Sequence, residues 1–208
     1  RFCLVDPAEF MDWGRCYRQG DTPWEKGEPH PELPFLLERY RELFAESDRL
    51  LIPGCGFGHD AALIAGTAGG EIEGLDIAKE AVMEAKEKYP LENISWQCGD
   101  LFEWSEGKEG AYDMVWEHTC FSAIPPETRL NYAVAMASLI RQGGYLLGVF
   151  FPNPDHPAGD GPPFHVSVAE LHQLFDKAFS LEWSAEPSKT FESRQGRGRE
   201  LSMLWQRK

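Results

Sequence analysis

The sequence has no apolar run as long as the roughly 20 residues that a membrane-spanning helix needs, so we expect no such helix. Positive charge is also scarce. The chain carries 20 lysines and arginines against 34 aspartates and glutamates, a formal net charge of −14 at pH 7. Because such a surface repels phosphate backbones, nucleic acid is not an expected partner. An anionic small molecule would need a locally positive site.

Cysteine is sparse, and its spacing excludes the familiar metal motifs. The five cysteines are Cys3, Cys16, Cys55, Cys98 and Cys120. They form no C-x-x-C pair and have no histidine at zinc spacing, so we expect no metal site. An odd count without a signal peptide favours reduced thiols and a cytoplasmic location. Because the chain begins at Arg1 rather than at methionine, a targeting signal in a preceding segment would not be seen.

One stretch, residues 50–77, organises the rest of the chain. Leu50–Ile52 is a short apolar run, typical of a parallel strand that is buried on both faces. Gly54, Gly56 and Gly58 follow at every second position. Glycines so close to a strand end indicate a backbone that turns sharply and leaves room for a ligand. An ordinary turn, with glycines for tight packing, is the alternative.

The same stretch continues with a helix over 59–68 and a second apolar strand over 72–75, which ends at Asp76. An acid about 20 residues after such a loop accepts hydrogen bonds from ribose hydroxyls. The dinucleotide pattern G-x-G-x-x-G, begun at Gly54, would need a glycine where His59 stands. The loop is therefore less suited to a pyrophosphate. It favours a nucleoside without phosphates, such as S-adenosylmethionine (SAM).

Strands and helices alternate along the remaining chain, which predicts an α/β fold with a Rossmann-like, mostly parallel sheet and helices on both faces. A chain of 208 residues is long enough for one domain with a real core. We divide that single domain, 1–208, into an N-terminal segment, 1–34, and an α/β core, 35–208. The other expected elements are helices over 34–44, 77–89, 125–141 and 167–177, and strands over 93–98, 112–116, 145–151, 179–183 and 201–205. In the helix over 77–89, Ile77 is expected on the apolar side.

The N-terminal segment is rich in aromatic residues. Phe10, Trp13 and Tyr17 fall at i, i+3 and i+7, on one face of a short helix, and Trp24 follows in a turn. With little aliphatic core of its own, the segment must pack on the main domain. We expect either an aromatic lid over a ligand site or plain packing of this face.

Acidic residues stand at three expected strand ends: Asp76, Asp100 and Glu117. Ligands of open α/β sheets bind at this edge. Asp100 with the apolar Leu101 suits the amine and ring of an adenine, although the same aspartate would cap a turn. Glu117 faces a cofactor tail or holds a loop, and His118 is expected to be structural.

These patterns resemble the class I SAM-dependent methyltransferases, and more narrowly the thiopurine S-methyltransferase family with its thiol and halide branch. The segments that carry the resemblance span nearly the whole chain: TPWEKG (22–27), LIPGCGFGHDAALIA (51–65), GLDI (74–77), GDLFEW (99–104), YDMVWEHTCFSAIPPETRLNYA (112–133) and GPPFHVSVAELHQLF (161–175). The resemblance implies a seven-stranded sheet with the last strand antiparallel.

The resemblance also implies which residues hold SAM and, after the reaction, S-adenosylhomocysteine. It places aromatic residues of the N-terminal segment over the cofactor, as suits a sulfonium cation. Gly54 would touch the amino-acid tail, Asp76 the ribose, and Asp100 with Leu101 the adenine. The complete expected set is Trp13, Tyr17, Trp24, Gly54, Asp76, Ile77, Asp100, Leu101 and Glu117.

The implied reaction is in-line methyl transfer to a small soft nucleophile such as a thiol, bisulfide or halide. Because a thiolate or halide arrives nucleophilic, we name no catalytic base. Phe121, Phe164 and His165 are candidates for the substrate wall, with packing as the alternative for both phenylalanines. Arg194 and Arg197 would either supply local positive charge or lie on the surface.

Three alternatives stay open. Family members that methylate thiols and halides tend to have tyrosine after Gly-Pro-Pro, where this chain has Phe164. That residue fits equally well with S-methylation of aromatic thiols such as thiopurines, or of metalloid oxyanions. A non-catalytic SAM-binding module is the second alternative, and a nicotinamide dehydrogenase is disfavoured by His59. We expect a monomer that acts on a small molecule.

Overall fold

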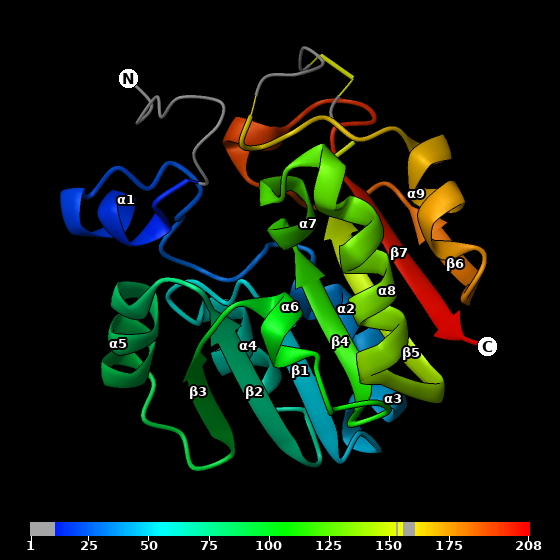
Figure 1. Ribbon diagram of the computed structural model, residues 1–208, viewed down its shortest axis with the longest axis horizontal. Helices are drawn as coiled ribbons and strands as arrows, with labels where there is room; N and C mark the ends of the chain where they lie inside the picture. Colours follow the sequence, from blue (N-terminus) through cyan, green and yellow to red (C-terminus); the bar gives the residue numbers. More distant parts are fainter. Residues whose placement is uncertain (1–10, 153, 156–160) are drawn as a thin grey trace.

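The computed structural model describes residues 11–152, 154–155 and 161–208 (Figure 1). In these residues seven strands form one sheet in the order β3-β2-β1-β4-β5-β7-β6. The strands are β1 (Arg49–Pro53), β2 (Glu71–Asp76), β3 (Ile94–Cys98), β4 (Tyr112–His118), β5 (Ile140–Phe150), β6 (Phe179–Ala185) and β7 (Leu201–Arg207). Strand β7 pairs antiparallel with both β5 and β6, whereas the other pairs are parallel. The predicted mostly parallel sheet with a reversed last strand is therefore confirmed.

Helices cover both faces of the sheet, as predicted. The described helices are α1 (Trp13–Gln19), α2 (Leu33–Arg39), α3 (Arg41–Ala45), α4 (His59–Ile64), α5 (Lys79–Lys88), α6 (Leu101–Trp104), α7 (Cys120–Ala123), α8 (Arg129–Leu139) and α9 (Val168–Phe175), with 3-10 turns η1 (Pro126–Thr128) and η2 (Glu192–Arg194). Figure 1 shows α8 in front of the sheet and α2 and α4 behind it. Within the described ranges, none of these helices is long and apolar enough to cross a membrane.

The core has two parts because successive strand side chains point to opposite faces. Leu51 and Val115 pack with α8 and α9 in one buried cluster. Their neighbours Leu50, Met114 and Trp116 pack with α2 and α4 in the other. The central strands are thus buried on both faces, which explains why they read as continuous apolar runs.

Several predicted helix boundaries were wrong. The helix expected over 59–68 ends at Ile64, and the helix expected over 34–44 is divided at Tyr40 into α2 and α3. The helix expected over 125–141 ends at Leu139, and β5 begins at Ile140, which pairs with Tyr112. Gly143 and Gly144, which follow the expected helix, lie within β5, where the pairing register shifts. The helix expected from Ile77 begins at Lys79 instead, and the Ile77 side chain is 53% exposed. Asp76 accepts a hydrogen bond from the Ala78 amide, 2.8 Å, which holds this turn outside the helix.

Residues 11–34, the described part of the N-terminal segment, form a short aromatic unit at the carboxyl ends of the parallel strands. The Asp12 side chain accepts from the Arg15 amide at the start of α1, and Gly20 ends the helix with a φ of 67°. Trp13 lies edge-on to Trp24, with ring centres 5.1 Å apart. Figure 1 shows α1 next to α5, and an ion pair between Arg18 and Glu80 joins the two helices. Phe10 lies outside the described residues.

Candidate active site

A cavity of about 360 Å³ opens where the parallel strands end. Its volume falls in the usual range of small-molecule sites. The N-terminal segment, the glycine loop, the ends of β2, β3 and β4 and the loop after β5 all contribute to its walls. The expected edge of the sheet is therefore the edge that holds the cavity.

The alternating glycines have a backbone reason. Gly54, Gly56 and Gly58 have φ values of 61°, 54° and 80°, a left-handed region that side chains disfavour. Gly54 and Gly56 line the cavity, whereas a Cβ on Gly58 would lie 2.4 Å from the Trp96 ring. Both interpretations of the loop thus apply, since two glycines open space for a ligand and the third allows close packing.

Asp76 stands at the cavity with its carboxylate already oriented. Its Oδ2 accepts from the Gly56 amide, 2.9 Å, and its Oδ1 accepts from the Ala78 amide, 2.8 Å. Burial raises the pKa of Asp76, and these two bonds oppose that effect. A carboxylate has about four acceptor positions, so each oxygen can still accept from a ligand hydroxyl. The exposed side chain of Ile77 lines the cavity beside it.

Asp100 and Leu101 also line the cavity, at the end of β3. Asp100 Oδ1 accepts from the amides of Phe102, 2.7 Å, and Glu103, 3.3 Å, and so caps α6. Its Oδ2 has no hydrogen-bond partner among the described residues. The capping role therefore leaves one oxygen for a ligand amine.

Trp13, Tyr17 and Trp24 line the opposite wall of the cavity. The Trp24 indole donates to the Tyr17 hydroxyl, 3.2 Å. Burial and the nearby Asp76 raise the pKa of Tyr17, so its hydroxyl stays neutral. Aromatic faces attract cations, and this wall suits a positively charged sulfonium.

Two predicted site residues lie beneath the cavity, outside its lining. Glu117 is fully buried, where its Oε1 accepts from the Phe121 amide, 2.9 Å, and its Oε2 accepts from the Tyr132 hydroxyl. Burial raises the pKa of Glu117 to about 7. Phe121 is also buried and packs edge-on against Tyr132. The geometry agrees with Glu117 as a residue that holds a loop, and the structure brings neither side chain to the cavity.

Phe164 and His165, predicted for the substrate wall, are not in the described lining, whereas Pro162 and Pro163 are. Sequence reasoning chose the aromatic side chains of this loop, but its prolines reach the cavity. Arg129 fixes the loop from α8, because its Nη2 donates to the carbonyls of Phe164, 3.2 Å, and His165, 2.8 Å.

The sequence analysis did not predict this anchoring role of Arg129. The only signal at this position was that Arg129 lies within the segment 112–133, which carries the family resemblance. Its guanidinium is buried and also pairs with Glu170, 2.8 Å. Ser167 caps α9, since its hydroxyl accepts from the Glu170 amide, 3.1 Å. The Glu170 carboxylate accepts from Arg129. The Arg129 side chain therefore joins α8, α9 and the loop that holds Phe164 and His165.

A cationic side completes the cavity. Lys26 and Arg194 both line it, and Arg194 is 12% exposed at its side chain. Partial burial and the charge of Arg194 lower the pKa of Lys26. His118 lines the cavity as well, whereas Arg197 does not appear in the described lining. An acidic protein thus presents a locally positive wall, the condition that an anionic ligand requires.

The cavity thiol is not an activated nucleophile. Cys120 lines the cavity, and burial raises its pKa well above the ordinary value. Burial has the same effect on Cys55, in the glycine loop. Both thiols therefore stay protonated at neutral pH. Within the described ranges no group of histidine, cysteine, aspartate and glutamate side chains is arranged to hold a metal ion.

Comparison with known sequences points to one family. The family described as thiopurine S-methyltransferase (TPMT) matches residues 8–207. Thiocyanate methyltransferase 1 of Brassica oleracea is 30% identical over 187 residues, which cover 86% of this chain and 79% of that protein. Probable thiol methyltransferase 2 of Arabidopsis thaliana is 32% identical over 166 residues, 78% of this chain and 70% of that protein. Bovine thiopurine S-methyltransferase is 29% identical over 170 residues, 71% of this chain and 69% of that protein.

Solved structures show the same fold at low identity. The N-methyltransferase NodS from Bradyrhizobium japonicum WM9, in complex with S-adenosylhomocysteine, superposes with a TM-score of 0.69 at 13% identity. The superposition covers 93% of this chain and 97% of that chain.

The geometry of the cavity residues also fits SAM. Gly54 and Gly56 leave space beside the sheet, Asp76 keeps acceptor capacity for ribose hydroxyls, and the half-exposed Ile77 offers an apolar contact for a ring. The chain belongs to the thiopurine S-methyltransferase family and is a SAM-dependent methyltransferase.

Proposed function

We propose that this enzyme methylates a small soft nucleophile, a thiol, bisulfide or halide, by in-line displacement. The observation that carries the proposal is the cationic wall of Lys26 and Arg194 in a chain of net charge −14. This wall offers a small anion a favourable place in a mainly apolar cavity. The names of the thiocyanate and thiol methyltransferase relatives support the same class of acceptor.

The residues on the other walls hold the cofactor in this proposal. Asp76 accepts from the ribose hydroxyls, Asp100 and Leu101 contact the adenine, and Gly54 lies beside the amino-acid tail. Trp13, Tyr17 and Trp24 cover the site, with residues 1–34 as a lid on the core, 35–208. When bound, SAM supplies an electrophilic methyl carbon.

The proposed reaction does not require a side chain that acts as a base. A thiolate or halide is nucleophilic as it arrives, so the protein needs only to orient it and to exclude water. The Cys120 thiol is protonated, and the Glu117 carboxyl is directed away from the cavity to Phe121 and Tyr132. We therefore propose that positioning, rather than proton transfer, accelerates the reaction.

A second candidate acceptor is an aromatic thiol such as a thiopurine. Phe102, Ile124 and Phe151 line the cavity and give it apolar walls that a flat ring would contact. The bovine thiopurine S-methyltransferase relative favours the same alternative. We also propose that the protein acts as a monomer in the cytoplasm.

An assay of S-adenosylhomocysteine tests the function, because this product forms whichever acceptor is methylated. Purified protein with SAM is offered thiocyanate, bisulfide, iodide and a thiopurine in turn, and kcat/KM is compared. We expect the highest value for a small anion. Turnover of the thiopurine alone would assign the second candidate, and cofactor binding without turnover of any acceptor would contradict both.

A further inference from the structure

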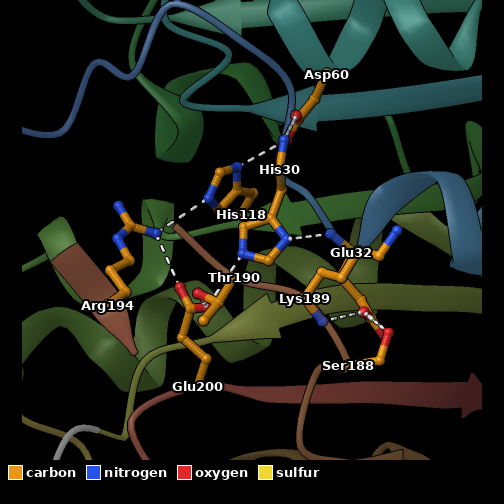
Figure 2. Close-up of polar contacts among 9 residues, drawn as sticks. All are labelled: His30, Glu32, Asp60, His118, Ser188, Lys189, Thr190, Arg194 and Glu200. Carbon is orange, nitrogen blue, oxygen red and sulfur yellow. Dashed lines mark hydrogen bonds and ion pairs between the residues drawn. The ribbon is translucent and has the colours of Figure 1, made fainter. Parts of the chain in front are cut away.

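We propose that His118, oriented by Asp60, is a positioning residue that fixes the Arg194 guanidinium on the acceptor wall. The inference rests on the proposed function, because it assigns the group that receives an anionic acceptor. Figure 2 shows the polar network to which both residues belong, and His118 and Arg194 are its members that line the cavity. The network joins four segments that are distant in sequence, through His30, Asp60, His118, Arg194 and Glu200.

Arg194 is held at one end of its guanidinium. Its Nη1 donates to His118 Nε2, 3.2 Å, and to Glu200 Oε1, 3.1 Å. Its central carbon lies 5.6 Å from the ring centres of both Phe151 and Phe191. Among the described residues Nε and Nη2 have no hydrogen-bond partner, and Figure 2 shows them on the side away from His118 and Glu200. A fixed guanidinium with free donors at a cavity suits an anion.

Asp60 determines which nitrogen of His118 carries the proton. Its carboxylate accepts from His118 Nδ1, 2.7 Å, from the Trp116 indole, 2.8 Å, and from the His30 amide, 2.8 Å. Hydrogen bonds from these three donors oppose the effect of burial and hold the pKa of Asp60 at about 2. Because Asp60 only accepts, Nδ1 is protonated, and Nε2 is left to accept from Arg194.

Glu200 secures the other side of the same Arg194 nitrogen. The carboxylate accepts from His30 Nε2, 3.1 Å, and from the Thr190 hydroxyl. His30 is fully buried, and its Nδ1 accepts from the Glu32 amide, 3.1 Å, so its proton lies on Nε2. Burial lowers the pKa of His30, which stays neutral. Burial would raise the pKa of Glu200, but hydrogen bonds from His30 and Thr190 and the charge of Arg194 lower it to about 2. Glu200 is therefore an anion that pairs with Arg194.

Two substitutions of His118 separate positioning from packing. In His118→Gln the amide can replace Nε2 as acceptor, whereas in His118→Asn the shorter amide replaces Nδ1 and reaches Asp60 only. Neither changes the charge of the network. The probe is thiocyanate, titrated by calorimetry into the complex with S-adenosylhomocysteine. We expect His118→Asn to weaken thiocyanate binding about tenfold, the loss of one charged hydrogen bond, and His118→Gln to weaken it much less.

Controls test whether the effect passes through Arg194. His172→Asn changes a histidine that pairs with Asp176 on α9, outside the described cavity lining, and should leave thiocyanate affinity unchanged. With Arg194→Gln already present, adding His118→Asn should produce no further loss, because the two residues act as one unit. Affinity for S-adenosylhomocysteine and melting temperature are measured for every variant.

Several results would overturn the inference. Equal thiocyanate affinities for His118→Asn and wild type would do so, as would losses that simply multiply in the double variant. If His118→Asn weakened the binding of S-adenosylhomocysteine as much as that of thiocyanate, the role of His118 would be merely structural. No thiocyanate binding to wild type would remove the anion site itself. If wild type binds thiocyanate as described but methylates no acceptor, only the proposed function fails, and the positioning role stands.

Discussion

The buried carboxyl of Glu117 should make the stability of this protein fall as the pH rises. Burial raises its pKa from 4.5 to about 7 in the folded chain. A group whose folded pKa exceeds its unfolded pKa contributes full stability below the unfolded value, and that contribution is lost as the pH rises through the folded value. Since each pKa unit corresponds to about 1.4 kcal/mol, the loss is on the order of 3 kcal/mol.

Glu117→Gln removes this titration with little change of shape. The amide oxygen can accept from the Phe121 amide, and the amide nitrogen can donate to the Tyr132 hydroxyl, so both present partners keep a hydrogen bond. The free energy of unfolding of the variant minus that of wild type should increase by about 2 to 3 kcal/mol when the pH is raised from 5 to 8. Other titrating groups cancel in this difference.

Urea unfolding followed by tryptophan fluorescence measures the effect at both pH values in both proteins. Glu182→Gln, an exposed site on β6, is the matched control. Parallel pH profiles for wild type and Glu117→Gln would refute the reasoning, because Glu117 would then be ionised in the fold without cost. SAM affinity should not change in the variant. A clear loss of affinity would instead place Glu117 against the cofactor.

Three further substitutions test the cavity and its loop. Asp76→Ala should weaken SAM binding at least tenfold by calorimetry while the circular dichroism spectrum stays native, and unchanged affinity would remove Asp76 from the site. Trp24→Ala should raise the dissociation constant for SAM, because an aromatic wall of the cavity is lost; an unfolded variant whose folded fraction keeps its affinity would make Trp24 a core residue. Gly58→Ala should lower stability by about 2 kcal/mol in urea, since φ is 80° and the Cβ would meet Trp96; a stability equal to wild type would contradict this packing.

The features that sequence predicted well were those set by short-range pattern. The glycine spacing at 54–58, the apolar runs and the acid at the end of β2 all depend on neighbours in sequence, and parallel topology brings the strand ends together. The start of the helix after Asp76 was missed because a side-chain bond to Ala78 displaced it.

The polar network was beyond such reasoning. His30 contacts Asp60 and Glu200 only in the folded chain, and no local sequence pattern around these three residues predicts the contacts. Sequence left open whether Arg194 supplies positive charge to the site or lies on the surface, and it is the ring of Phe191 and the Glu200 carboxylate that hold it at the cavity. Non-local contacts of this kind decide which side chains of a loop reach a site.

Isotope tracing detects methyl transfer from SAM to a small anion. The protein is incubated with SAM that carries a carbon-13 methyl group, together with iodide, bisulfide or thiocyanate, and the headspace is analysed by mass spectrometry. We expect volatile methyl iodide, methanethiol or methyl thiocyanate with the label, formed in proportion to enzyme and lost in Asp76→Ala. Absence of labelled product from every anion, with SAM still bound, would contradict the proposed methylation of a small anion.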